Sequence, residues 1–293
     1  MLTSYLCWGE ILWDMFPDGP QLGGAVANVA YHLAALGAPV GLISRVGDDQ
    51  LGRDAIAQFA ALGADTSLIQ VDPERETGVV VVNLSNDGEP KYSLKTGKAW
   101  ERIECTPAAQ TAVASARAFC FGTLSQRLAS GRRSFEQVIE SLPEDCVAFC
   151  DPNLRPHHID TSSLELAMRT ADVVKINDVE AELLAKAFDV ADVVDWLLSS
   201  MDVRMVALTR GPDGSRLISR DAEHDHSGLP ASSGGDNVGA GDAYVAALVW
   251  HVIAGSTIER ANVAANRYGA FVASNRGATP ALPGELHAEL IAL

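Results

Sequence analysis

Short, nearly continuous apolar runs alternate along this chain with longer segments of helical spacing. Strands that are apolar on both faces are typical of a parallel sheet buried between helices. The runs that we predict as strands are Val40–Val46, Ala116–Gly122, Cys146–Asp151, Asp172–Ile176 and Arg204–Thr209. The pattern therefore predicts an α/β fold in which helices cover both faces of a central, mostly parallel sheet, a three-layer α/β/α arrangement.

Two helical patterns between these runs have clear ends. Residues Ala25–Leu36 and Leu51–Leu62 have helical spacing, and a glycine, Gly37 or Gly63, follows each of them. Glycine is common just beyond a helix because it adopts the left-handed conformation easily. Since the helices alternate with strands, ligands are expected at the carboxyl ends of the strands.

One section, Thr77–Leu94, interrupts this alternation. It holds two strand-like runs around Asn86-Asp87-Gly88, which is a hairpin turn signal, and Ile11–Phe16 could pair with it. We therefore expect residues 11–16 and 77–95 to form a small β lid over a site. The same hairpin could instead be a surface decoration, and the pattern alone leaves both interpretations open.

Length and charge narrow the classes of protein. A chain of 293 residues fits one large α/β domain or two ordinary ones, and no linker or repeat divides it, so we expect a single domain over residues 1–293. The net charge of −16 disfavours nucleic acid and anionic membranes as partners, because such a surface repels them. An anionic ligand must then be held by local geometry.

The cysteines and the N-terminus bear on location. The cysteines are odd in number, contain no CxxC pair and indicate a reducing compartment: Cys7, Cys105, Cys120, Cys146 and Cys150. The first residues lack the basic start of a signal peptide, and the longest apolar run, near Ala243–Ala254, is too short to span a bilayer. We therefore expect a cytoplasmic protein.

The stretch Gly234–Val249 carries the most informative chemistry. After Asp242 the side chains are apolar on nearly every side, which predicts a buried helix that Gly255 ends. Gly239-Ala240-Gly241 then lies at the helix N-terminus, where free N–H groups can bind an anion without a basic side chain. Asp242 could stabilise the helix dipole, or it could take the proton from a hydroxyl that attacks a phosphate. The stretch alone supports both interpretations.

Five motifs, in order, resemble the signatures of the ribokinase-like sugar kinases, the PfkB family. They are GGAVANVAYHLAALG (Gly23–Gly37), VGDDQLG (Val46–Gly52), KINDVEAELL (Lys175–Leu184), TRGPDGS (Thr209–Ser215) and GGDNVGAGDAYVAALV (Gly234–Val249). Neither GxxxxGK[ST] nor GxGxxG occurs, so the P-loop and the dinucleotide fingerprint do not apply. The resemblance covers nearly the whole chain and implies a ribokinase-like fold and an ATP-dependent carbohydrate kinase.

Within that family the chain looks most like the bacterial fructokinases. The similarity rests on GEILWDMFP, GGAVAN, FGTLSQR and DPNLR (Asp151–Arg155), whereas ribokinases usually have a lysine where this chain has Ala25. The resemblance implies that Asp242 is the general base. It also implies that Gly239, Ala240 and Gly241 form an anion hole for the charge that develops on the γ-phosphoryl group.

The resemblance also implies a sugar site. Asp14, Gly24 and Asn28 match the sugar-binding positions of the family, and carboxylate and amide groups suit the recognition of hydroxyls. Without the resemblance, the favoured interpretation is that Asp14 is a turn residue after a strand and that Asn28 is a capping group inside an Ala-rich helix. Arg155 could neutralise phosphate, contact the sugar or be solvated.

Two further motifs are expected near the nucleotide. Asn177 and Glu180 match the positions that organise Mg²⁺ through water, although their spacing also fits a capping box at a helix start. Thr209, Gly211 and Gly214 would border ATP, or they form a tight turn after a strand.

Departures from the family pattern concern cations. Asn237 stands where threonine is usual and Tyr244 where phenylalanine is common. Asp236 with oxygens of residues 274–279 could bind K⁺, as in some relatives, but Asn237 weakens that expectation. The pairs His224/His226 and His157/His158 are expected in polar loops without a third ligand at sensible spacing, so no resident metal is predicted there.

The sequence thus predicts a sugar kinase that uses ATP and Mg²⁺, with D-fructose converted to fructose 6-phosphate as the leading reaction. Other acceptors are a nucleoside, a 2-keto-3-deoxy sugar acid or a sugar phosphate; an acidic acceptor would need cations such as Arg102, Arg127 or Arg155. A non-catalytic sugar or nucleotide sensor on the same fold is the alternative from another class. Pairing of the lids, with Val79–Val82 covered by a partner, would give a homodimer.

Overall fold

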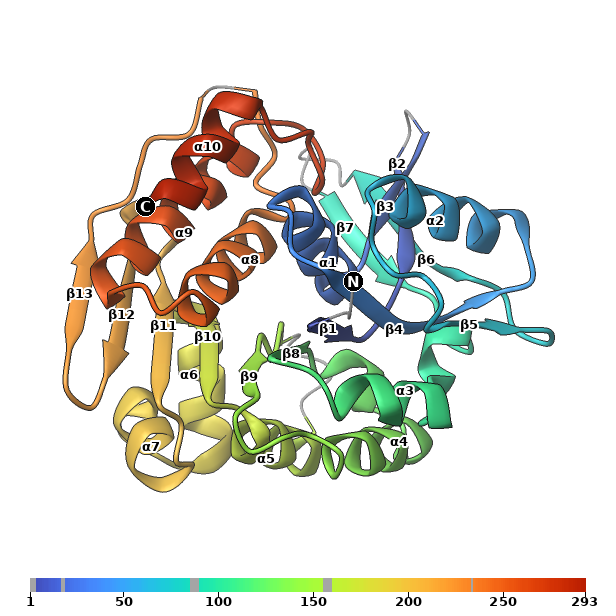
Figure 1. Cartoon of the computed structure of the whole chain (residues 1–293), viewed down its shortest axis with the longest axis horizontal. Coiled ribbons are helices and arrows are strands. Elements are labelled where there is room, and N and C mark those ends of the chain that lie inside the picture. The colour runs from blue at the N-terminus through green and yellow to red at the C-terminus, as the bar shows by residue number, and fades with distance from the viewer. Residues whose placement is uncertain (1–3, 17–18, 85–89, 155–159, 233) are drawn as a thin grey trace.

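The computed structural model describes residues 4–16, 19–84, 90–154, 160–232 and 234–293. Nine strands of the described chain form the central sheet, in the order β13-β12-β11-β10-β9-β8-β1-β4-β5 (Figure 1). Their bounds are β1 (Tyr5–Trp8), β4 (Val40–Gly47), β5 (Ile69–Asp72), β8 (Ala118–Phe121), β9 (Val147–Cys150), β10 (Val173–Asn177), β11 (Met205–Thr209), β12 (Ser215–Ser219) and β13 (Glu223–His226).

The sheet is parallel from β5 to β11, and only β12 and β13 run antiparallel to their neighbours. The helices on one face are α1 (Ala25–Ala35), α2 (Gln50–Ala61), α8 (Ala240–Ile253), α9 (Ile258–Ala273) and α10 (Gly284–Ala292). Those on the other face are α3 (Pro107–Val113), α4 (Ala129–Ile139), α5 (Thr161–Thr170), α6 (Asp178–Phe188) and α7 (Val193–Ser200). The predicted three-layer α/β/α fold is therefore confirmed (Figure 1).

Each face of the sheet has its own apolar core. Leu6, Trp8, Phe119 and Phe121 alternate in direction with Tyr5, Cys7 and Cys120, so the two sets pack on opposite sides of the central strands. Because both sets are buried, these strands read as continuous apolar runs in the sequence.

Helix α8 lies deepest among the helices of its layer. It packs against α1 and α9, and Figure 1 shows α1 and α8 side by side above the middle of the sheet. Residues Ala243–Val249 are all buried, as expected for a helix that is apolar on nearly every side. The N-terminus of α8 is therefore held at a fixed position over the sheet.

A second, smaller sheet stands apart from the central one. Its strand order is β3-β2-β6-β7, with β2 (Leu12–Phe16), β3 (Gly19–Gly23), β6 (Gly78–Leu84) and β7 (Pro90–Leu94). Strand β2 runs parallel to β6 and antiparallel to β3. The turn predicted at Asn86-Asp87-Gly88 lies outside the described residues. We refer to this four-stranded sheet as the lid sheet.

Some elements differ from the sequence-based expectation. Strand β3 was not predicted, because Gly19 and Pro20 are residues that weaken strands. His224 and His226 lie in β13, an edge strand, and not in a loop as we expected. Strands β1, β5 and β12 were not predicted either, and the ends of the five predicted strands of the central sheet differ from the observed ends by at most two residues.

Two findings concern the whole described chain. None of the helices in the described segments combines the length and the apolar character that crossing a membrane requires. All five cysteines are free thiols, and Cys105 is the one that is not fully buried.

Candidate active site

Polar side chains gather at the carboxyl ends of the parallel strands. Glu10 follows β1, Asp151 follows β9, and Asn177 and Thr209 end β10 and β11. The N-termini of α1 and α8 point to the same edge, because each of these helices packs over the sheet beside those strands (Figure 1). In an open α/β sheet this edge is where ligands bind.

Asp242 and Asn28 are joined directly, although 214 positions separate them in the chain. Asn28 Nδ2 donates a hydrogen bond of 2.8 Å to Asp242 Oδ2. Asn28 is buried on α1, and its Oδ1 is also buried and has no hydrogen-bond partner among the described residues. A buried amide oxygen is costly to leave unsatisfied, so this atom is ready to accept a hydrogen bond from a hydroxyl group of a ligand.

The surroundings of Asp242 favour its neutral form. Burial raises the pKa of Asp242 to about 7, and the charges of Asp151 and Glu10 add to the rise. The hydrogen bond from Asn28 and the charge of Lys175 act in the opposite direction. Taken as a whole residue, Asp242 is only partly buried, so it can still exchange a proton with solvent. A carboxyl group with a pKa near neutrality can accept and release a proton at working pH.

The N-terminus of α8 is built around a left-handed glycine. Gly239 has φ 75° at the N-cap, and a Cβ at this position would lie 2.6 Å from Cα and O of Ala278. The N–H groups of Gly239, Gly241 and Asp242 meet no hydrogen-bond acceptor among the described residues. The Ala240 N–H, in contrast, donates to the Asn237 carbonyl at 3.3 Å. Three N–H groups are thus available to an anion, and Ala240 contributes less than the sequence implied.

Hydrogen bonds fix the backbone of Ala278 in turn. Its carbonyl accepts a hydrogen bond of 2.9 Å from His32 Nε2, so His32 Nδ1 accepts from the hydroxyl of Tyr268 at 2.8 Å. Burial lowers the pKa of His32 to about 4, which keeps the ring neutral and this arrangement intact. Three elements, α1, α9 and the loop after α9, therefore fix the backbone against which Gly239 packs.

Lys175 and Asp151 form a buried ion pair that the sequence analysis did not assign to the site. Lys175 Nζ lies 3.1 Å from Asp151 Oδ2, with both side chains about one-tenth exposed. The signals that could have revealed the pair were a lysine inside the apolar run DVVKI and the aspartate that ends the neighbouring run CVAFCD.

Asn177 and Glu180 form the capping box that was the alternative interpretation. Asn177 Oδ1 accepts from the Glu180 N–H at 2.8 Å, and Glu180 Oε2 accepts from the Asn177 N–H at 2.9 Å. Glu180 Oε1 accepts from the Leu154 N–H at 2.8 Å, so the carboxylate also anchors the segment after Asp151. Burial, and next Asp151, raise the pKa of Glu180, while Lys175 and the backbone N–H groups oppose the rise.

Thr209, Gly211 and Gly214 lie in the tight turn between β11 and β12. Gly211 and Gly214 both have positive φ, and Gly214 packs directly against the backbone of His226 and Gly228. Thr209 pairs with Asn177 across the strand ends, which brings the turn to the edge where α6 begins. A turn and a nucleotide-binding edge are both compatible with this placement.

The lid sheet brings Asp14 to the α1 end of the site. Asp14 faces Gln21 across the β2–β3 pair and packs against Gly23, where a side chain would collide with it. Gly24 has φ 106°, and a Cβ there would lie 2.5 Å from the Glu10 carbonyl. Arg155 lies outside the described residues.

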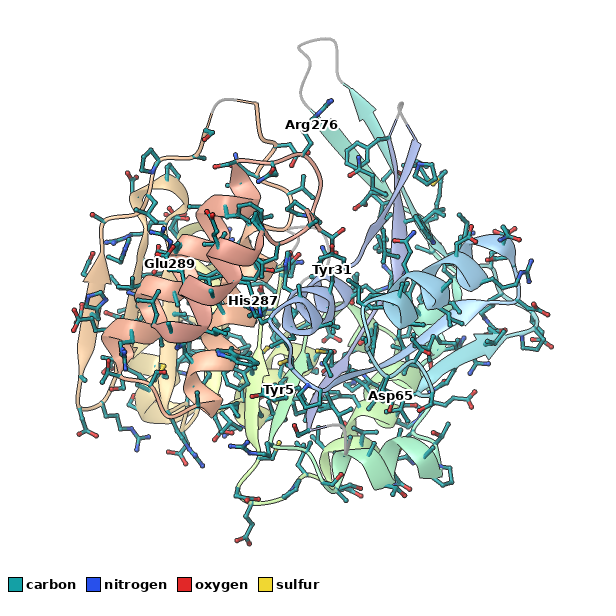
Figure 2. The ribbon with its side chains drawn as sticks, turned by 45° about the horizontal axis from the view of Figure 1, so that its top comes forward. Tyr5, Tyr31, Asp65, Arg276, His287 and Glu289 are labelled. Carbon is teal, nitrogen blue, oxygen red and sulfur yellow. The ribbon has the colours of Figure 1, made fainter. Side chains whose placement is uncertain are left out.

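The loop after α9 connects the lid sheet with the N-terminus of α8. Figure 2 shows Arg276 beside the lid strands, and Gly277 packs directly against the side chain of Gln21. Asp236 Oδ2 accepts from the Gly277 N–H at 2.9 Å, and Oδ1 accepts from the Val238 N–H at 3.1 Å. The Asp236 carboxylate thus clamps two loops together.

The remaining candidates have structural partners. Arg127 pairs with Glu101 and stacks over Trp100, and Arg102 donates to Ser130 Oγ. Tyr244 donates from its hydroxyl to Ser215 and Asn262, which explains a tyrosine at this buried position. Within the described segments no three His, Cys, Asp or Glu side chains are grouped as a metal site would require. His157 and His158 lie outside those segments.

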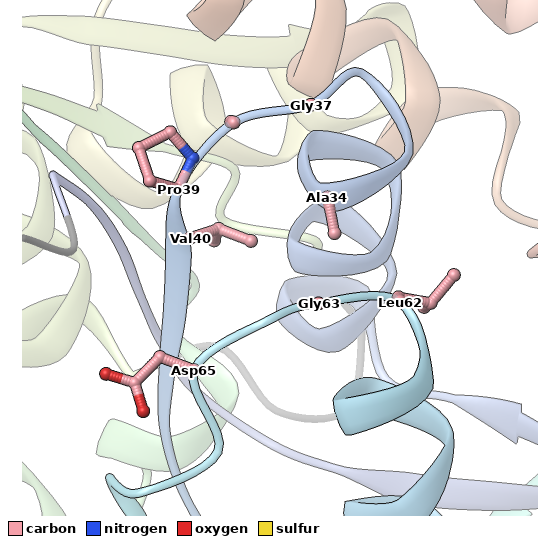
Figure 3. Close-up of a pocket in the computed structure, with 8 residues that line it drawn as sticks. Ala34, Gly37, Pro39, Val40, Leu62, Gly63 and Asp65 are labelled. Carbon is pink, nitrogen blue, oxygen red and sulfur yellow. The ribbon is translucent and has the colours of Figure 1, made fainter. Parts of the chain in front are cut away.

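A surface pocket among the described residues lies away from this edge of the sheet. A surface pocket of about 340 Å³ lies between the ends of α1 and α2 and the start of β4, lined by residues such as Gly37, Pro39 and Asp65 (Figure 3). A much smaller cavity of about 10 Å³ lies beneath Asp242 and Asp151. Because Figure 3 shows only Asp65 as a charged side chain, the larger pocket lacks the chemistry described above.

Comparison with known proteins assigns the family. Residues 20–284 match the model of the pfkB family carbohydrate kinases. Among curated relatives, fructokinase-1 of Oryza sativa subsp. japonica is 28% identical over 95% of this chain and 94% of its own length. The fructokinase of Escherichia coli is 28% identical over 94% of both chains. The chain belongs to the pfkB family of carbohydrate kinases, and it is an ATP-dependent sugar kinase.

Solved structures share the fold. An uncharacterized sugar kinase from Pyrococcus horikoshii in complex with ATP is 26% identical, with a TM-score of 0.82 over 94% of each chain. A putative ribokinase II from E. coli with ATP and Mg²⁺ is 23% identical, with a TM-score of 0.83 over 95% of each chain. A fructokinase double mutant from Vibrio cholerae with fructose, ADP and potassium is 22% identical, with a TM-score of 0.81 over 99% and 98%.

Proposed function

We propose that this sugar kinase transfers the γ-phosphoryl group of ATP to the 6-hydroxyl of D-fructose and forms fructose 6-phosphate. The observation that carries the proposal is the Asn28–Asp242 hydrogen bond beside the N-terminus of α8. The Asp242 carboxyl group has a pKa near 7, and the Oδ1 atom of its partner Asn28 is unsatisfied among the described residues. Three available N–H groups lie at the same helix N-terminus. The curated fructokinases that align with nearly the whole chain favour fructose as the acceptor.

In the proposed reaction Asp242 accepts the proton of the 6-hydroxyl. The hydroxyl oxygen forms a bond to the γ-phosphorus, the bond between that phosphorus and the β–γ bridging oxygen breaks, and its electron pair leaves with ADP. The N–H groups of Gly239 and Gly241, with a smaller share from Ala240, stabilise the charge on the transferring phosphoryl group. The Asp242 proton returns to solvent when the products leave.

The sugar is oriented by short polar groups. Asn28 Oδ1 accepts a hydrogen bond from a sugar hydroxyl group, which satisfies the buried oxygen. Asp14 binds further hydroxyls from the lid sheet, and Gly24 leaves room for the sugar ring at the start of α1. Arg155 remains a predicted contact to phosphate or sugar. A closed lid sheet would exclude water and so suppress the hydrolysis of ATP.

The residues present fit Mg²⁺ and the nucleotide. Each Glu180 oxygen accepts one backbone N–H and keeps a lone pair, and Mg²⁺ binds carboxylates readily through its own waters. Glu180 and Asn177 would hold the ion through water, where it would neutralise charge on the ATP phosphates. Thr209, Gly211 and Gly214 would border the nucleotide. Each Asp236 oxygen likewise accepts one backbone N–H and keeps a lone pair, so a K⁺ ion near Asp236 would use this carboxylate together with loop carbonyls.

Other acceptors fit less well. A 2-keto-3-deoxy sugar acid or a sugar phosphate needs a cation beside the sugar. Arg127 is neutralised by Glu101, and Arg102 lies on the surface with Ser130 as its partner. A nucleoside has no such requirement and is the second candidate. A sensor without turnover is disfavoured, because pure binding does not need a carboxyl group such as Asp242 beside the anion site.

A coupled assay of ATP consumption tests the proposal. The purified chain is offered D-fructose, D-ribose, a 2-keto-3-deoxy sugar acid, fructose 6-phosphate and a panel of nucleosides, each with MgATP. We expect the highest kcat/KM for D-fructose, with the phosphate on carbon 6 by NMR. A higher kcat/KM for another acceptor would replace fructose, and binding without turnover would favour the sensor. The same assay with K⁺ replaced by tetramethylammonium tests the potassium expectation.

The location and the assembly are part of the proposal. A cytoplasmic enzyme agrees with five free cysteines. A homodimer through the lid sheet agrees with strand β6, in which Val80 is buried while Val79 and Val81 are half-buried.

A further inference from the structure

A lysine side chain reaches the N-terminus of α8 from the sheet below it. Lys175 lies on β10, and its Nζ would be 3.2 Å from a Cβ placed on Gly241. The ammonium group therefore lies directly against the backbone of Gly241, one of the residues whose N–H has no acceptor among the described residues. Any side chain at position 241 would separate the ammonium group from the anion site.

Lys175 is held in place and charged. Its Nζ donates to Asp151 Oδ2 at 3.1 Å, and Asp151 Oδ1 accepts from the Asn153 N–H at 3.2 Å. This is the one hydrogen bond that the described residues offer to an ammonium group with three N–H donors. Burial alone would lower the pKa of Lys175, but the charges of Asp151, Glu180 and Asp242 raise it above its ordinary value. The ammonium group is thus a permanent cation with donors to spare.

A buried ion pair is a poor means of stabilising a fold, since the loss of hydration offsets much of the attraction. Three carboxyl groups interact with Lys175, although a single carboxylate would be enough to balance its charge. The position of the Lys175 ammonium group against Gly241 suits a ligand that carries negative charge at that point. The transferring phosphoryl group of the proposed reaction would be such a ligand.

We propose that Lys175, fixed by Asp151 behind Gly241, contacts the transferring phosphoryl group and stabilises its charge together with the N–H groups of α8. The inference rests on the proposed phosphoryl transfer but not on the identity of the sugar. It assigns a second purpose to Gly241, whose missing side chain exposes the ammonium group to the ligand. An ammonium group acts here as a point charge, as lysines do at other phosphate sites.

Three variants separate this role from a structural one. Lys175→Met removes the cation but leaves Asp151 buried without its partner. Asp151→Asn keeps the cation and can still accept the Asn153 N–H through Oδ1. The double variant Lys175→Met/Asp151→Asn removes the cation without leaving an unpaired carboxylate in its place. Lys186→Met makes the same substitution at an exposed position near the end of α6 and serves as the control.

We expect both Lys175→Met and the double variant to lose about a hundredfold in kcat, the usual effect of losing one group that stabilises transition-state charge. Asp151→Asn should stay within about tenfold of the wild type, and thermal melting should show that the double variant is folded. Recovery of wild-type turnover by the double variant would show that Lys175 only neutralises Asp151 and would overturn the proposal.

A binding measurement makes the inference independent of the sugar. Calorimetry compares MgADP with MgADP plus aluminium fluoride, which mimics the transferring phosphoryl group. Lys175→Met should weaken the affinity for the aluminium fluoride complex about tenfold or more beyond any loss for MgADP, and Lys186→Met should change neither. Equal losses for both ligands would contradict the contact. Failure of fructose to react would overturn only the proposed acceptor, because this measurement contains no sugar.

Discussion

At the scale of single residues, the account depends on how the protein treats Asp242. Burial and the charge of Asp151 raise its pKa to about 7, whereas Asn28 and Lys175 limit the rise. Because the folded-state pKa lies above the unfolded value, ionisation of Asp242 costs folding free energy, and this cost appears as the pH rises from about 4 through 7. The protein thus accepts a loss of stability to keep a carboxyl group with a pKa near 7 at this position.

The pH dependence of turnover follows from this pKa. With Asp242 as the base, kcat should rise with pH through about 7, because only the ionised carboxylate can accept the hydroxyl proton. A pH–rate profile at saturating ATP and sugar measures this, and the residual activity of Asp242→Asn should lack the acid limb. A wild-type profile that is flat between about pH 5 and 8 would argue against Asp242 as the titrating group.

Asp14 offers a second test on one side chain. Since Asp14 lies on β2 beside Gly23 and away from α8, Asp14→Ala should weaken sugar binding far more than ATP binding. We expect KM for the sugar to rise about tenfold or more, as loss of hydrogen bonds to a charged group does, with KM for ATP nearly unchanged. Asp54→Ala, an exposed aspartate on α2, is the control. Equal losses for both substrates would contradict the assigned sugar position.

At the residue scale, the sequence allows candidate residues to be predicted but not the contacts between them. Asp242, Asn28 and Gly239 could be selected as candidate site residues from motifs, because the spacing within each motif is local. Their contact could not, because Asn28 and Asp242 meet only when α1 and α8 pack together. Lys175 and Asp151 were missed for the same reason: each is a single polar residue at an apolar strand, and the pair forms across two strands.

At the scale of elements, α8 links the fold to the site. The helix is buried on all sides and begins at Gly239, whose left-handed φ of 75° turns the chain into the helix. At its other end Gly255 has nearly the same φ, 74°, but nothing lies within 4 Å of a Cβ placed there. A side chain at Gly255 would therefore meet only the cost of the left-handed backbone, whereas a side chain at Gly239 would meet that cost and a steric collision.

Alanine at these two positions gives a matched pair of variants. Gly255→Ala should cost about 1 kcal/mol, because only the left-handed conformation is penalised. Gly239→Ala should cost clearly more and reduce turnover at least tenfold, since its Cβ would collide with Ala278 and displace the N–H groups of α8. Urea unfolding and kcat for both variants check this. Similar stability and activity for the two variants would contradict the steric role of Ala278.

Elements with strong apolar patterns were predictable, and edge elements were not. Strands β4, β8, β9, β10 and β11 were predicted from their continuous apolar runs, and α1, α2 and α8 from their helical patterns, whereas β1 and β5 were not predicted. Strands β3, β12 and β13 are partly exposed, and β13 reads as the polar sequence EHDH. Their pairing is set by neighbouring strands more than by their own residues, so a pattern along the chain could not reveal them.

At the scale of the whole molecule, local geometry must overcome the net charge. A chain with net charge −16 repels ATP at long range, and the site concentrates N–H groups and the Lys175 ammonium group at one edge of the sheet. The fold class and the edge that holds the site could be predicted from the order of strands and helices. The pairing of β2 with β6 was expected from the sequence, whereas the fourth strand of the lid sheet, β3, needed the structure.

Assembly through the lid sheet is the prediction at this scale. Sedimentation equilibrium should give twice the chain mass of 31.0 kDa, because half-buried valines on β6 would be covered by a second copy. Val81→Lys should shift the wild-type dimer toward the monomer, since a charged side chain disfavours burial there. A monomeric wild type at micromolar concentrations would rule out a lid dimer.

The central claim is that Asp242 takes the proton while the N-terminus of α8 holds the phosphoryl group. Asp242→Asn keeps the shape of the side chain and removes its basicity, so it tests the claim most directly. We predict that kcat falls about a hundredfold or more, while the Kd for MgATP measured by calorimetry stays within about threefold of the wild type. Turnover by Asp242→Asn close to that of the wild type would contradict the account.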